Sequence, residues 1–269
     1  MPTKARLSQA AVEERRQAVL RHVVAEGESG IGALAERFGV SLMTMHRDLD
    51  DLAARHLLRK ERGRAVAYPA LTMETATRFR VDANLAVKSA LCAAAAARIA
   101  PGSTLLVDDS TTLYPLAAAL AGIEQLTVVT NSVGVAQRMA AAAPGADVTL
   151  LGGHYRGEFN CCTGPEVARA LARLHADVAL MSATAVLQGR LYHPMREFVE
   201  VKEAMLASAA RALLLVDHSK FGKTATHAYG TATGYEAVIT DAATPAEEID
   251  ALGALGVPVE TTTAPEGTC

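Results

Sequence analysis

The chain has 269 residues, of which 50% are hydrophobic and 20% charged, and its formal net charge is −3. At about 100–200 residues per domain, this length predicts one large domain or a small domain followed by a large one. No apolar run reaches the ~18–20 residues of a membrane-spanning helix, and the charged N-terminus lacks the apolar stretch of a signal peptide. The composition argues against a membrane protein and favours a cytoplasmic one.

The charge is distributed unevenly along the chain. Residues 1–64 contain 12 Lys and Arg against 9 Asp and Glu, a net charge of +3, whereas residues 65–269 contain 14 against 20, a net charge of −6. Such asymmetry between segments indicates an anionic partner for the basic part.

The four cysteines, Cys92, Cys161, Cys162 and Cys269, form neither a disulfide-dense pattern nor a zinc-binding pattern of paired C-x-x-C motifs. We therefore expect no metal, no cofactor and a reducing compartment. Cys92 is best explained as a small core residue. Adjacent Cys161 and Cys162 are compatible with a vicinal disulfide or a redox switch, but two free thiols near a loop are the favoured interpretation.

The spacing of apolar residues predicts three helices in the first 54 residues, over 9–26, 31–38 and 42–54. Ser8 and Ser41 are the expected N-caps, while Gly27 and Gly39 allow the left-handed conformation that ends a helix. Two short helices joined by a tight turn with glycine are the arrangement of a helix-turn-helix, whose second helix enters the major groove of DNA.

The third helix is expected to bury one face and expose the other. The predicted inner positions are Leu42, Met45, Leu49 and Leu52, and the predicted outward positions are Met43, Thr44, His46, Arg47 and Asp50. The N-terminal half of such a helix reaches the base edges. The expected DNA contacts on and before it are Ser41, Met43, Thr44, His46 and Arg47.

Two short extended pieces flank Arg62-Gly63-Arg64 and predict a β-hairpin, or wing, after the third helix. Arg62 and Arg64 at its tip are expected to lie along DNA phosphates. The sequence thus predicts a winged helix-turn-helix domain over residues 1–70 and a polar linker over 71–83.

The remaining residues, 84–269, predict one α/β domain in which strands and helices alternate. The expected strands are 104–107, 126–130, 148–151, 178–181, 213–216, 238–240 and 257–260, and the expected helices are 84–100, 114–121, 134–143, 164–174, 196–210 and 245–252. Apolar strands separated by helices indicate a mostly parallel sheet that is covered on both faces. Ligands of such sheets bind beyond the carboxyl ends of the strands.

Polar residues follow several of these strands. They are Asp108, Ser110, Thr111 and Thr112 after the first, Asn131 and Ser132 after the second, Gly153 after the third, and Asp217 and Lys220 after the fifth, with Lys202 on the helix before it. Hydroxyls, an amide, carboxylates and two lysines at one edge suit a polar, anionic, polyhydroxylated ligand, which points to a sugar phosphate.

Motifs throughout the chain resemble those of the DeoR family of bacterial transcriptional regulators. The N-terminal ones are the Glu-Arg-Arg run at 14–16, ALAERFGVS at 33–41 and TMHRDL at 44–49; the C-terminal ones are LLVDDSTTLYPLAAAL at 105–120, LTVVTNS at 126–132, VTLLGGHYR at 148–156 and VKEAMLASAARALLLVDHSKFG at 201–222. The resemblance implies a winged helix-turn-helix and a sensor domain similar in fold to ribose-5-phosphate isomerase. It further implies a repressor of sugar catabolism that acts as a dimer or tetramer and is released by a phosphorylated sugar.

Several residues depart from the family pattern. His46 replaces the first Arg of an Arg-Arg pair, and Arg62-Gly63-Arg64 stands where the family has His-Gly-Gly. Ser110 occupies the Gly position of a Gly-Thr-Thr loop, and Ser182 begins a segment that replaces Gly-Ala-x-Gly-Ile. The operator sequence and the sugar therefore cannot be transferred from the family.

Two alternatives to a repressor stay open at the level of sequence. An activator would differ only in where its operator lies. A sugar-phosphate isomerase could use Asp108, Asp217 and Lys202 for proton transfer, although the additional carboxylate and Gly-rich loop of such enzymes are not evident here.

Overall fold

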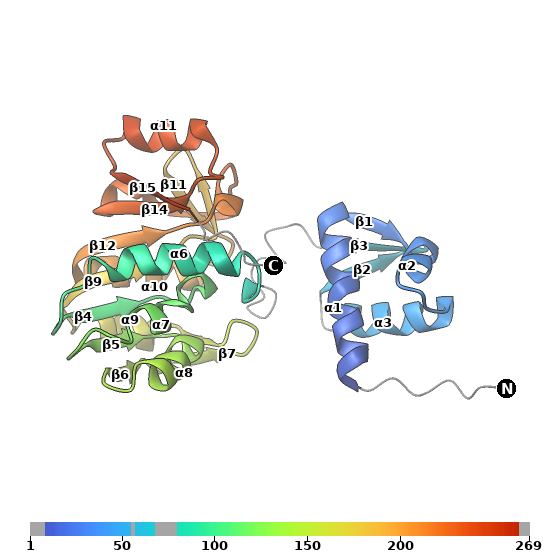
Figure 1. Cartoon of the computed structure of the whole chain (residues 1–269), viewed down its shortest axis with the longest axis horizontal. Coiled ribbons are helices and arrows are strands. Elements are labelled where there is room, and N and C mark those ends of the chain that lie inside the picture. The colour runs from blue at the N-terminus through green and yellow to red at the C-terminus, as the bar shows by residue number, and fades with distance from the viewer. Residues whose placement is uncertain (1–8, 55–56, 68–79, 264–269) are drawn as a thin grey trace. The chain divides into compact units, whose positions relative to one another are not determined.

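The structure is a computed structural model that describes residues 9–54, 57–67 and 80–263. The chain divides into two compact units, Met1–Glu74 and Thr75–Cys269, which are described separately (Figure 1). Ser8 and most of the expected linker lie outside the described residues, so both remain predictions. Residues 81–84 form a turn, and Val81 packs against the core of the second unit.

The N-terminal unit combines three helices with a small antiparallel sheet. The elements are α1 (Gln9–Glu26), β1 (Glu28–Gly30), α2 (Ile31–Arg37), α3 (Leu42–Ala54), β2 (Leu58–Glu61) and β3 (Arg64–Ala67), and the strand order is β1-β3-β2. The three helices and the wing hairpin are confirmed. Strand β1 was not predicted, because three residues are too few to show a strand periodicity.

One of the four inner positions predicted for α3 is wrong. Met45, Leu49 and Leu52 are fully buried, but the side chain of Leu42 is 53% exposed. The fourth buried position belongs to Asp48, which is 2% exposed and pairs with arginines of α1. Helical periodicity shows on which side of a helix a residue lies, but not where the neighbouring element ceases to cover that side.

The C-terminal unit is built on a parallel sheet of seven strands, as predicted. In spatial order they are β15 (Val259–Thr262), β14 (Ala237–Asp241), β12 (Ala209–Leu215), β9 (Ala176–Met181), β4 (Thr104–Val107), β5 (Thr127–Thr130) and β6 (Asp147–Leu150). Neighbours in this order are parallel. The carboxyl ends of all seven therefore lie at one edge of the sheet.

Helices cover both faces of this sheet (Figure 1). One face is covered by α6 (Leu85–Ala96), α7 (Leu116–Ala119) and α8 (Val133–Ala142). The other face is covered by α9 (Pro165–Leu171), α10 (Arg196–Ala207) and α11 (Ala246–Ala254). Alternating residues of β9 enter two separate cores: Val178 and Leu180 pack with α6 to α8, whereas Ala179 and Met181 pack with α9 to α11. This alternation is the period of two that a strand imposes, and it confirms the predicted α/β class.

Short antiparallel strands that the sequence did not predict lie outside the main sheet. β7 (His154–Arg156) pairs with β8 (Cys161–Thr163), and β11 (Arg190–His193) pairs with both β10 (Ala185–Leu187) and β13 (His227–Thr231). Cys161 and Cys162 lie in β8 as buried free thiols, not in a loop. No helix among the described residues is long and apolar enough to span a membrane.

Candidate functional site

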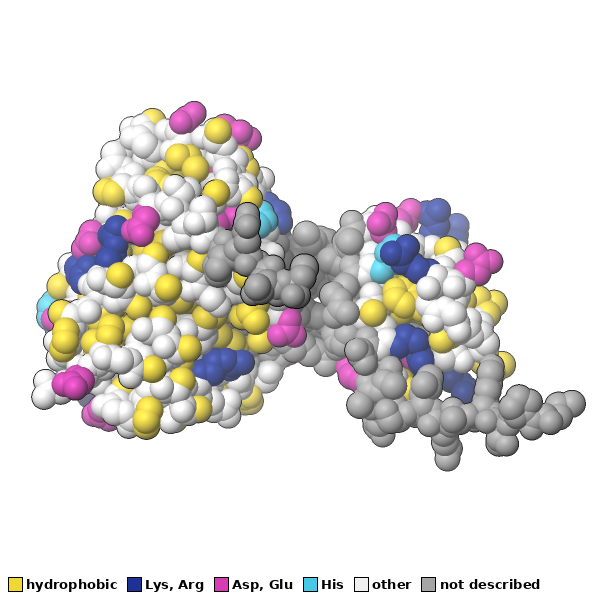
Figure 2. Space-filling view, in the orientation of Figure 1, with side chains coloured by type: hydrophobic (Ala, Val, Ile, Leu, Met, Phe, Trp, Pro, Cys, Tyr) yellow, Lys and Arg dark blue, Asp and Glu magenta, His cyan; other side chains and the backbone are white. Residues whose placement is uncertain are grey.

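The N-terminal end of α3 is organised by a cap. Ser41 Oγ accepts a hydrogen bond from the Thr44 amide at 3.2 Å and lies 2.9 Å from Thr44 Oγ1. Beyond this cap, Met43, His46 and Arg47 are exposed, on the face where the helical pattern placed them. Figure 2 shows that this unit presents a mixture of basic, acidic and hydrophobic side chains in the orientation drawn.

A lysine of the wing connects the hairpin to this exposed face. Lys60 Nζ on β2 lies 2.5 Å from Asp50 Oδ1 and 3.3 Å from His46 Nδ1, both on α3. The sequence did not single out Lys60, since its contacts depend on how β2 folds back over α3.

The two arginines at the wing tip have different surroundings. Arg62 and Gly63 both have positive φ, +38° and +81°, as a two-residue turn of this kind requires. Arg62 is exposed and makes no ion pair with a described residue, whereas Arg64 pairs with Glu28 on β1. The charge of Arg64 is therefore partly neutralised within the unit.

A partly buried group of ion pairs connects α3 to α1. Both oxygens of Asp48 are engaged, one by Arg15 Nε at 2.8 Å and the other by Arg16 Nε at 3.0 Å. Arg16 also lies 3.0 Å from Asp51. The orientation of α3 relative to α1 depends on these contacts as well as on apolar packing.

In the C-terminal unit, a buried polar cluster lies at the carboxyl end of β4. Asp108 Oδ2 accepts from Lys202 Nζ at 2.5 Å and from the Ser182 amide at 2.9 Å, while Oδ1 accepts from the Ser110 amide at 2.8 Å. Burial alone would lower the pKa of Lys202, but Asp108 and Asp109 raise it above its usual value. Lys202 is therefore a charged ammonium group in this cluster.

The segment after Asp108 begins a short 3₁₀ turn, Thr111–Leu113. Ser110 Oγ caps this turn by accepting from the Thr112 amide at 3.2 Å. Thr111 Oγ1 lies 3.4 Å from the ammonium nitrogen of Lys88, a residue of α6 that is only 3% exposed. Desolvation lowers the pKa of Lys88 to about 8, against the opposing effect of Asp217.

Lys88 is a candidate site residue that the sequence reasoning missed, because it lies within an Ala-rich helix. The sequence nevertheless contains a feature that could have identified it. A lysine among small apolar residues, on a helix predicted to pack closely on the sheet, is rarely buried without a charged or polar partner.

Residues at the end of β5 are held mainly by protein contacts. Asn131 Nδ2 donates to the Cys162 carbonyl at 2.8 Å, and Ser132 Oγ caps α8 by accepting from the Val135 amide at 3.2 Å. The buried oxygens that lack a hydrogen-bond partner among the described residues include Asn131 Oδ1, Thr163 Oγ1 and Ser182 Oγ. Orphaned acceptors are costly, so they mark places where a ligand or water supplies the missing bond.

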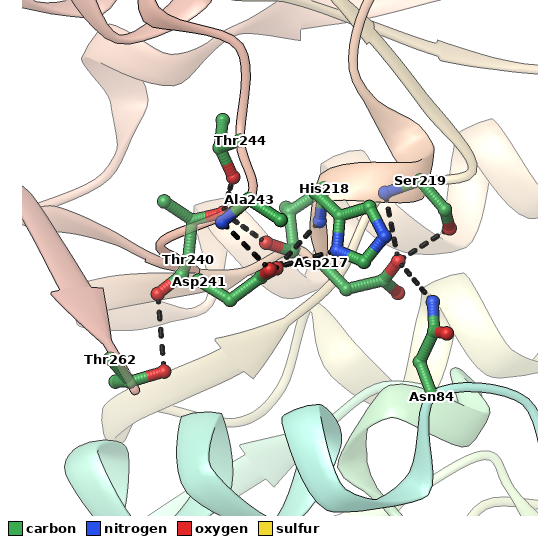
Figure 3. Close-up of polar contacts among 10 residues, drawn as sticks. Asn84, Asp217, His218, Ser219, Thr240, Asp241, Ala243, Thr244 and Thr262 are labelled. Carbon is green, nitrogen blue, oxygen red and sulfur yellow. Dashed lines mark hydrogen bonds and ion pairs between the residues drawn. The ribbon is translucent and has the colours of Figure 1, made fainter. Parts of the chain in front are cut away.

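The end of β12 forms a second polar cluster (Figure 3). Asp217 Oδ1 accepts from Asn84 Nδ2 at 2.9 Å and from the Ser219 amide at 3.0 Å. Burial alone would raise the pKa of Asp217, but Lys220 and the hydrogen bonds from Ser219 and Asn84 lower it below its usual value. Lys220 is itself buried.

The neighbouring residue His218 is clamped by Asp241, at the end of β14. The His218 amide donates to Asp241 Oδ1 at 2.7 Å, and His218 Nδ1 lies 2.8 Å from Oδ2 (Figure 3). The Asp241 carboxylate thus fixes the orientation of the His218 ring through its Nδ1 edge.

Gly153 has a packing explanation. A Cβ at this position would lie 2.6 Å from the Thr163 carbonyl oxygen and 2.9 Å from Val167 Cγ2. Glycine is thus needed where the chain passes β8, whether or not a ligand approaches.

The predicted effector residues at the ends of β4 and β12 come together around Lys88, which contacts Thr111 and is attracted by Asp217. Lys202 joins Asp108 from α10. An open pocket elsewhere is lined by Arg156, Met195, Arg196, Glu197 and Glu200 and contains none of the predicted residues. The candidate site is therefore the sheet edge, where buried charges and unpaired oxygens gather.

A chain that joins a winged helix-turn-helix to a separate α/β unit has the domain composition of a transcriptional regulator. The comparison with protein families is specific: residues 15–69 match a DeoR-like helix-turn-helix domain, and residues 83–242 match the DeoR C-terminal sensor domain. The chain therefore belongs to the DeoR family.

Relatives of known name match over nearly the whole length. The chain is 28% identical to the glycerol-3-phosphate regulon repressor of Escherichia coli, over 89% of this chain and 94% of the relative. It is 27% identical to the transcriptional repressor GlcR of Bacillus subtilis, over 95% and 98%, and 26% identical to the transcriptional repressor AccR of Agrobacterium fabrum, over 86% and 90%.

Among solved structures, ribose-5-phosphate isomerase A from Neisseria gonorrhoeae aligns with a TM-score of 0.37 and 13% identity, over 50% of this chain and 52% of that one. The probable sor operon regulator from Shigella flexneri aligns with a TM-score of 0.34 and 10% identity, over 52% and 77%.

Proposed function

We propose that this protein represses an operon for sugar or carbohydrate catabolism and is released from its operator by a phosphorylated sugar bound in the C-terminal unit. The observation that carries this proposal is the buried group of lysines and carboxylates at the carboxyl edge of the sensor sheet. The names of the relatives support it, since each is a repressor and one controls a glycerol-3-phosphate regulon. A regulator of this kind acts in the cytoplasm as a dimer or tetramer.

On the DNA side, the exposed face of α3 reads base edges and the wing follows the backbone. Thr44, His46 and Arg47 offer hydrogen-bonding groups from the first turns of the helix, as base readout in the major groove requires. Arg62 and Arg64 bind phosphates, which adds affinity without adding sequence information.

On the effector side, the lysines Lys88 and Lys220 bind the phosphate. Both are buried and both lie beside Asp217, which limits their mutual repulsion. The hydroxyl groups of the sugar take the remaining polar positions at the edge: Asp108, Ser110, Thr111, Thr112, Asn131, Ser132, Gly153, Lys202 and Asp217.

Repression and induction are linked by reciprocity. If the effector binds preferentially to a conformation with low operator affinity, operator DNA must weaken effector binding by the same factor. Two half-sites, read by two copies of the chain, supply the affinity that one small unit cannot.

The experiment is a DNA-binding titration with the full-length protein and fragments from upstream of the gene, in the presence and absence of sugar phosphates. Inorganic phosphate and unphosphorylated sugars serve as controls. The active compound should weaken DNA binding in the unaltered protein and in the control variant Arg173→Met, which removes an exposed cation, but not in Lys88→Met. If no phosphorylated sugar alters DNA affinity, the induction model is wrong, while DNA binding itself stands.

Under the same proposal, the protein is a regulator without isomerase activity. Both oxygens of Asp108 already accept hydrogen bonds from Lys202 and two backbone amides, which leaves this carboxylate poorly suited to abstract a proton. Turnover of pentose or hexose phosphates by the purified protein would contradict this part of the proposal.

A further inference from the structure

Two large apolar side chains are exposed next to each other at the start of α3. Leu42 is 53% exposed and Met43 is 67% exposed, and they are the first two residues of the helix. Among the side chains that the structure describes in the N-terminal unit, no other large hydrophobic one is exposed to this degree. Exposed apolar pairs are costly unless a partner covers them.

Polar and basic groups surround this apolar pair. Met43 Sδ lies 3.9 Å from Arg47 Nη2, one helical turn further along. His46, one turn after Leu42, is bridged to Lys60 of the wing at 3.3 Å. A partner for this surface must therefore have negative charges and small apolar groups close to each other.

The major groove of DNA offers both. Its walls are lined by phosphates, and the C5-methyl of thymine is the distinctive apolar group on its floor. We propose that Leu42 and Met43 contact thymine methyl groups, and that this contact is part of how the protein selects its operator. The inference rests on the proposed function, in which α3 enters the major groove.

The surface chemistry favours DNA over a second copy of the chain. A contact between two copies of this surface would bring Arg47 and its equivalent together, along with the other basic groups near the pair. A contact with DNA would place the same groups beside phosphates, where opposite charges attract.

The first experiment uses deoxyuridine, which differs from thymidine only by the missing methyl group. The full-length protein selects binding sites from a random duplex pool, and the selected duplex is titrated beside a copy in which deoxyuridine replaces thymidine. We expect the dissociation constant to rise about fourfold for each methyl group contacted. Replacement at single positions then locates the contacted steps.

The second experiment repeats the titration with altered proteins. Met43→Gln keeps the length of the side chain but makes it polar, and should reduce the thymidine preference; the double variant Leu42→Asn, Met43→Gln should abolish it. Met43→Leu, the matched apolar control, should retain it. Circular dichroism and an unchanged salt dependence of DNA binding show that the unit is folded and still contacts phosphates.

The outcomes separate this inference from the proposed function. Equal affinity for the two duplexes, or a thymidine preference that survives in the double variant, overturns the inference alone. A changed oligomeric state in the double variant with an unaltered thymidine preference would assign the pair to a contact between copies. Failure to select any DNA sequence overturns the inference and the proposed function together.

Discussion

Lys202 Nζ lies 2.5 Å from Asp108 Oδ2, with the two side chains only 4% and 1% exposed. The pair joins α10 to the end of β4 across 94 residues of sequence. Each ion loses its hydration in the folded state, so the pair is stable only because both members are present and their remaining hydrogen bonds are satisfied. The same pair lies at the proposed effector site, which links the stability of the sensor unit to the chemistry of binding.

The first prediction concerns removal of one member of this pair. Lys202→Met leaves Asp108 buried without its cation and should destabilise the sensor unit by about 3–5 kcal/mol. Adding Asp108→Asn removes the uncompensated charge but keeps an oxygen for the backbone amides. The double variant should therefore be more stable than Lys202→Met alone, as a double-mutant cycle can measure.

Tyrosine signals make this measurement selective. The chain has no tryptophan, and five of its six tyrosines lie at residue 114 or later, within the C-terminal unit. Urea unfolding of the full chain, followed by near-UV circular dichroism, reports on the sensor unit. If the double variant is less stable than Lys202→Met, then the uncompensated charge of Asp108 is not the cause of the lost stability.

The second prediction is a pH dependence of effector binding through Lys88, whose pKa is lowered to about 8. A bound phosphate stabilises the charged ammonium and raises this pKa, so the effector affinity should fall as the pH rises from about 8, by at most about tenfold per unit. The phosphate itself stays dianionic over this range, since its second pKa is about 6. Lys88→Arg keeps its charge and should remove this pH dependence.

The same group makes a prediction about the free protein. Its pKa of about 8 in the folded protein lies below the usual lysine pKa of 10.5. The unfolded chain therefore binds more protons between these values, and the free energy of unfolding should rise with pH across that interval. Calorimetry at several pH values, with Lys88→Met as the comparison, measures the effect. A slope that is the same in both proteins would exclude Lys88 as its source.

The main elements of the fold could be predicted because their sequence patterns are long or repeated. Seven apolar strands alternate with helices, and each predicted strand overlaps an observed strand of the parallel sheet. The rule that ligands bind at the carboxyl ends of parallel strands then brought Asp108, Asp217 and Lys220 to one edge. These residues lie at the same edge because parallel strands end there, and the alternation of strands and helices in the sequence is enough to predict a parallel sheet.

Features that depend on one particular contact could not be predicted. Lys88 is remote in sequence from the strand ends and reaches Thr111 only because α6 packs beside the 3₁₀ turn Thr111–Leu113. Asp241 ends β14 and His218 follows β12, so the contact between them requires these two strands to lie side by side. The exposure of Leu42 and the burial of Asp48 likewise depend on where α1 and α2 cover α3.

The fourth prediction concerns the charge of the wing. Glu28 pairs with Arg64, and both side chains are at least half exposed. Glu28→Gln should release Arg64 for a DNA phosphate, raising DNA affinity and steepening the slope of log Kobs against log salt concentration by about 0.9. Glu166→Gln, which breaks an exposed pair with Arg169 in the other unit, is the matched control. An unaltered slope in Glu28→Gln would show that Arg64 does not reach the DNA.

The last prediction compares two aspartates on the same helix. Asp48 is buried and bound by two arginines of α1, whereas Asp50 is exposed and pairs with Lys60 at 2.5 Å. Asp48→Asn should destabilise the N-terminal unit by about 1–3 kcal/mol and weaken DNA binding, because a neutral amide replaces the carboxylate that Arg15 and Arg16 both contact, although Arg16 keeps its contact with Asp51. Asp50→Asn breaks an exposed pair worth about 0–1 kcal/mol. It should leave the unit folded and tighten DNA binding, since it removes a negative charge from the face of α3 that meets the DNA.

Far-UV circular dichroism and DNA titration distinguish the two variants. A loss of DNA binding in Asp50→Asn as large as in Asp48→Asn would contradict this prediction, because it would show that the exposed contact with Lys60 matters as much as the Asp48 ion pair.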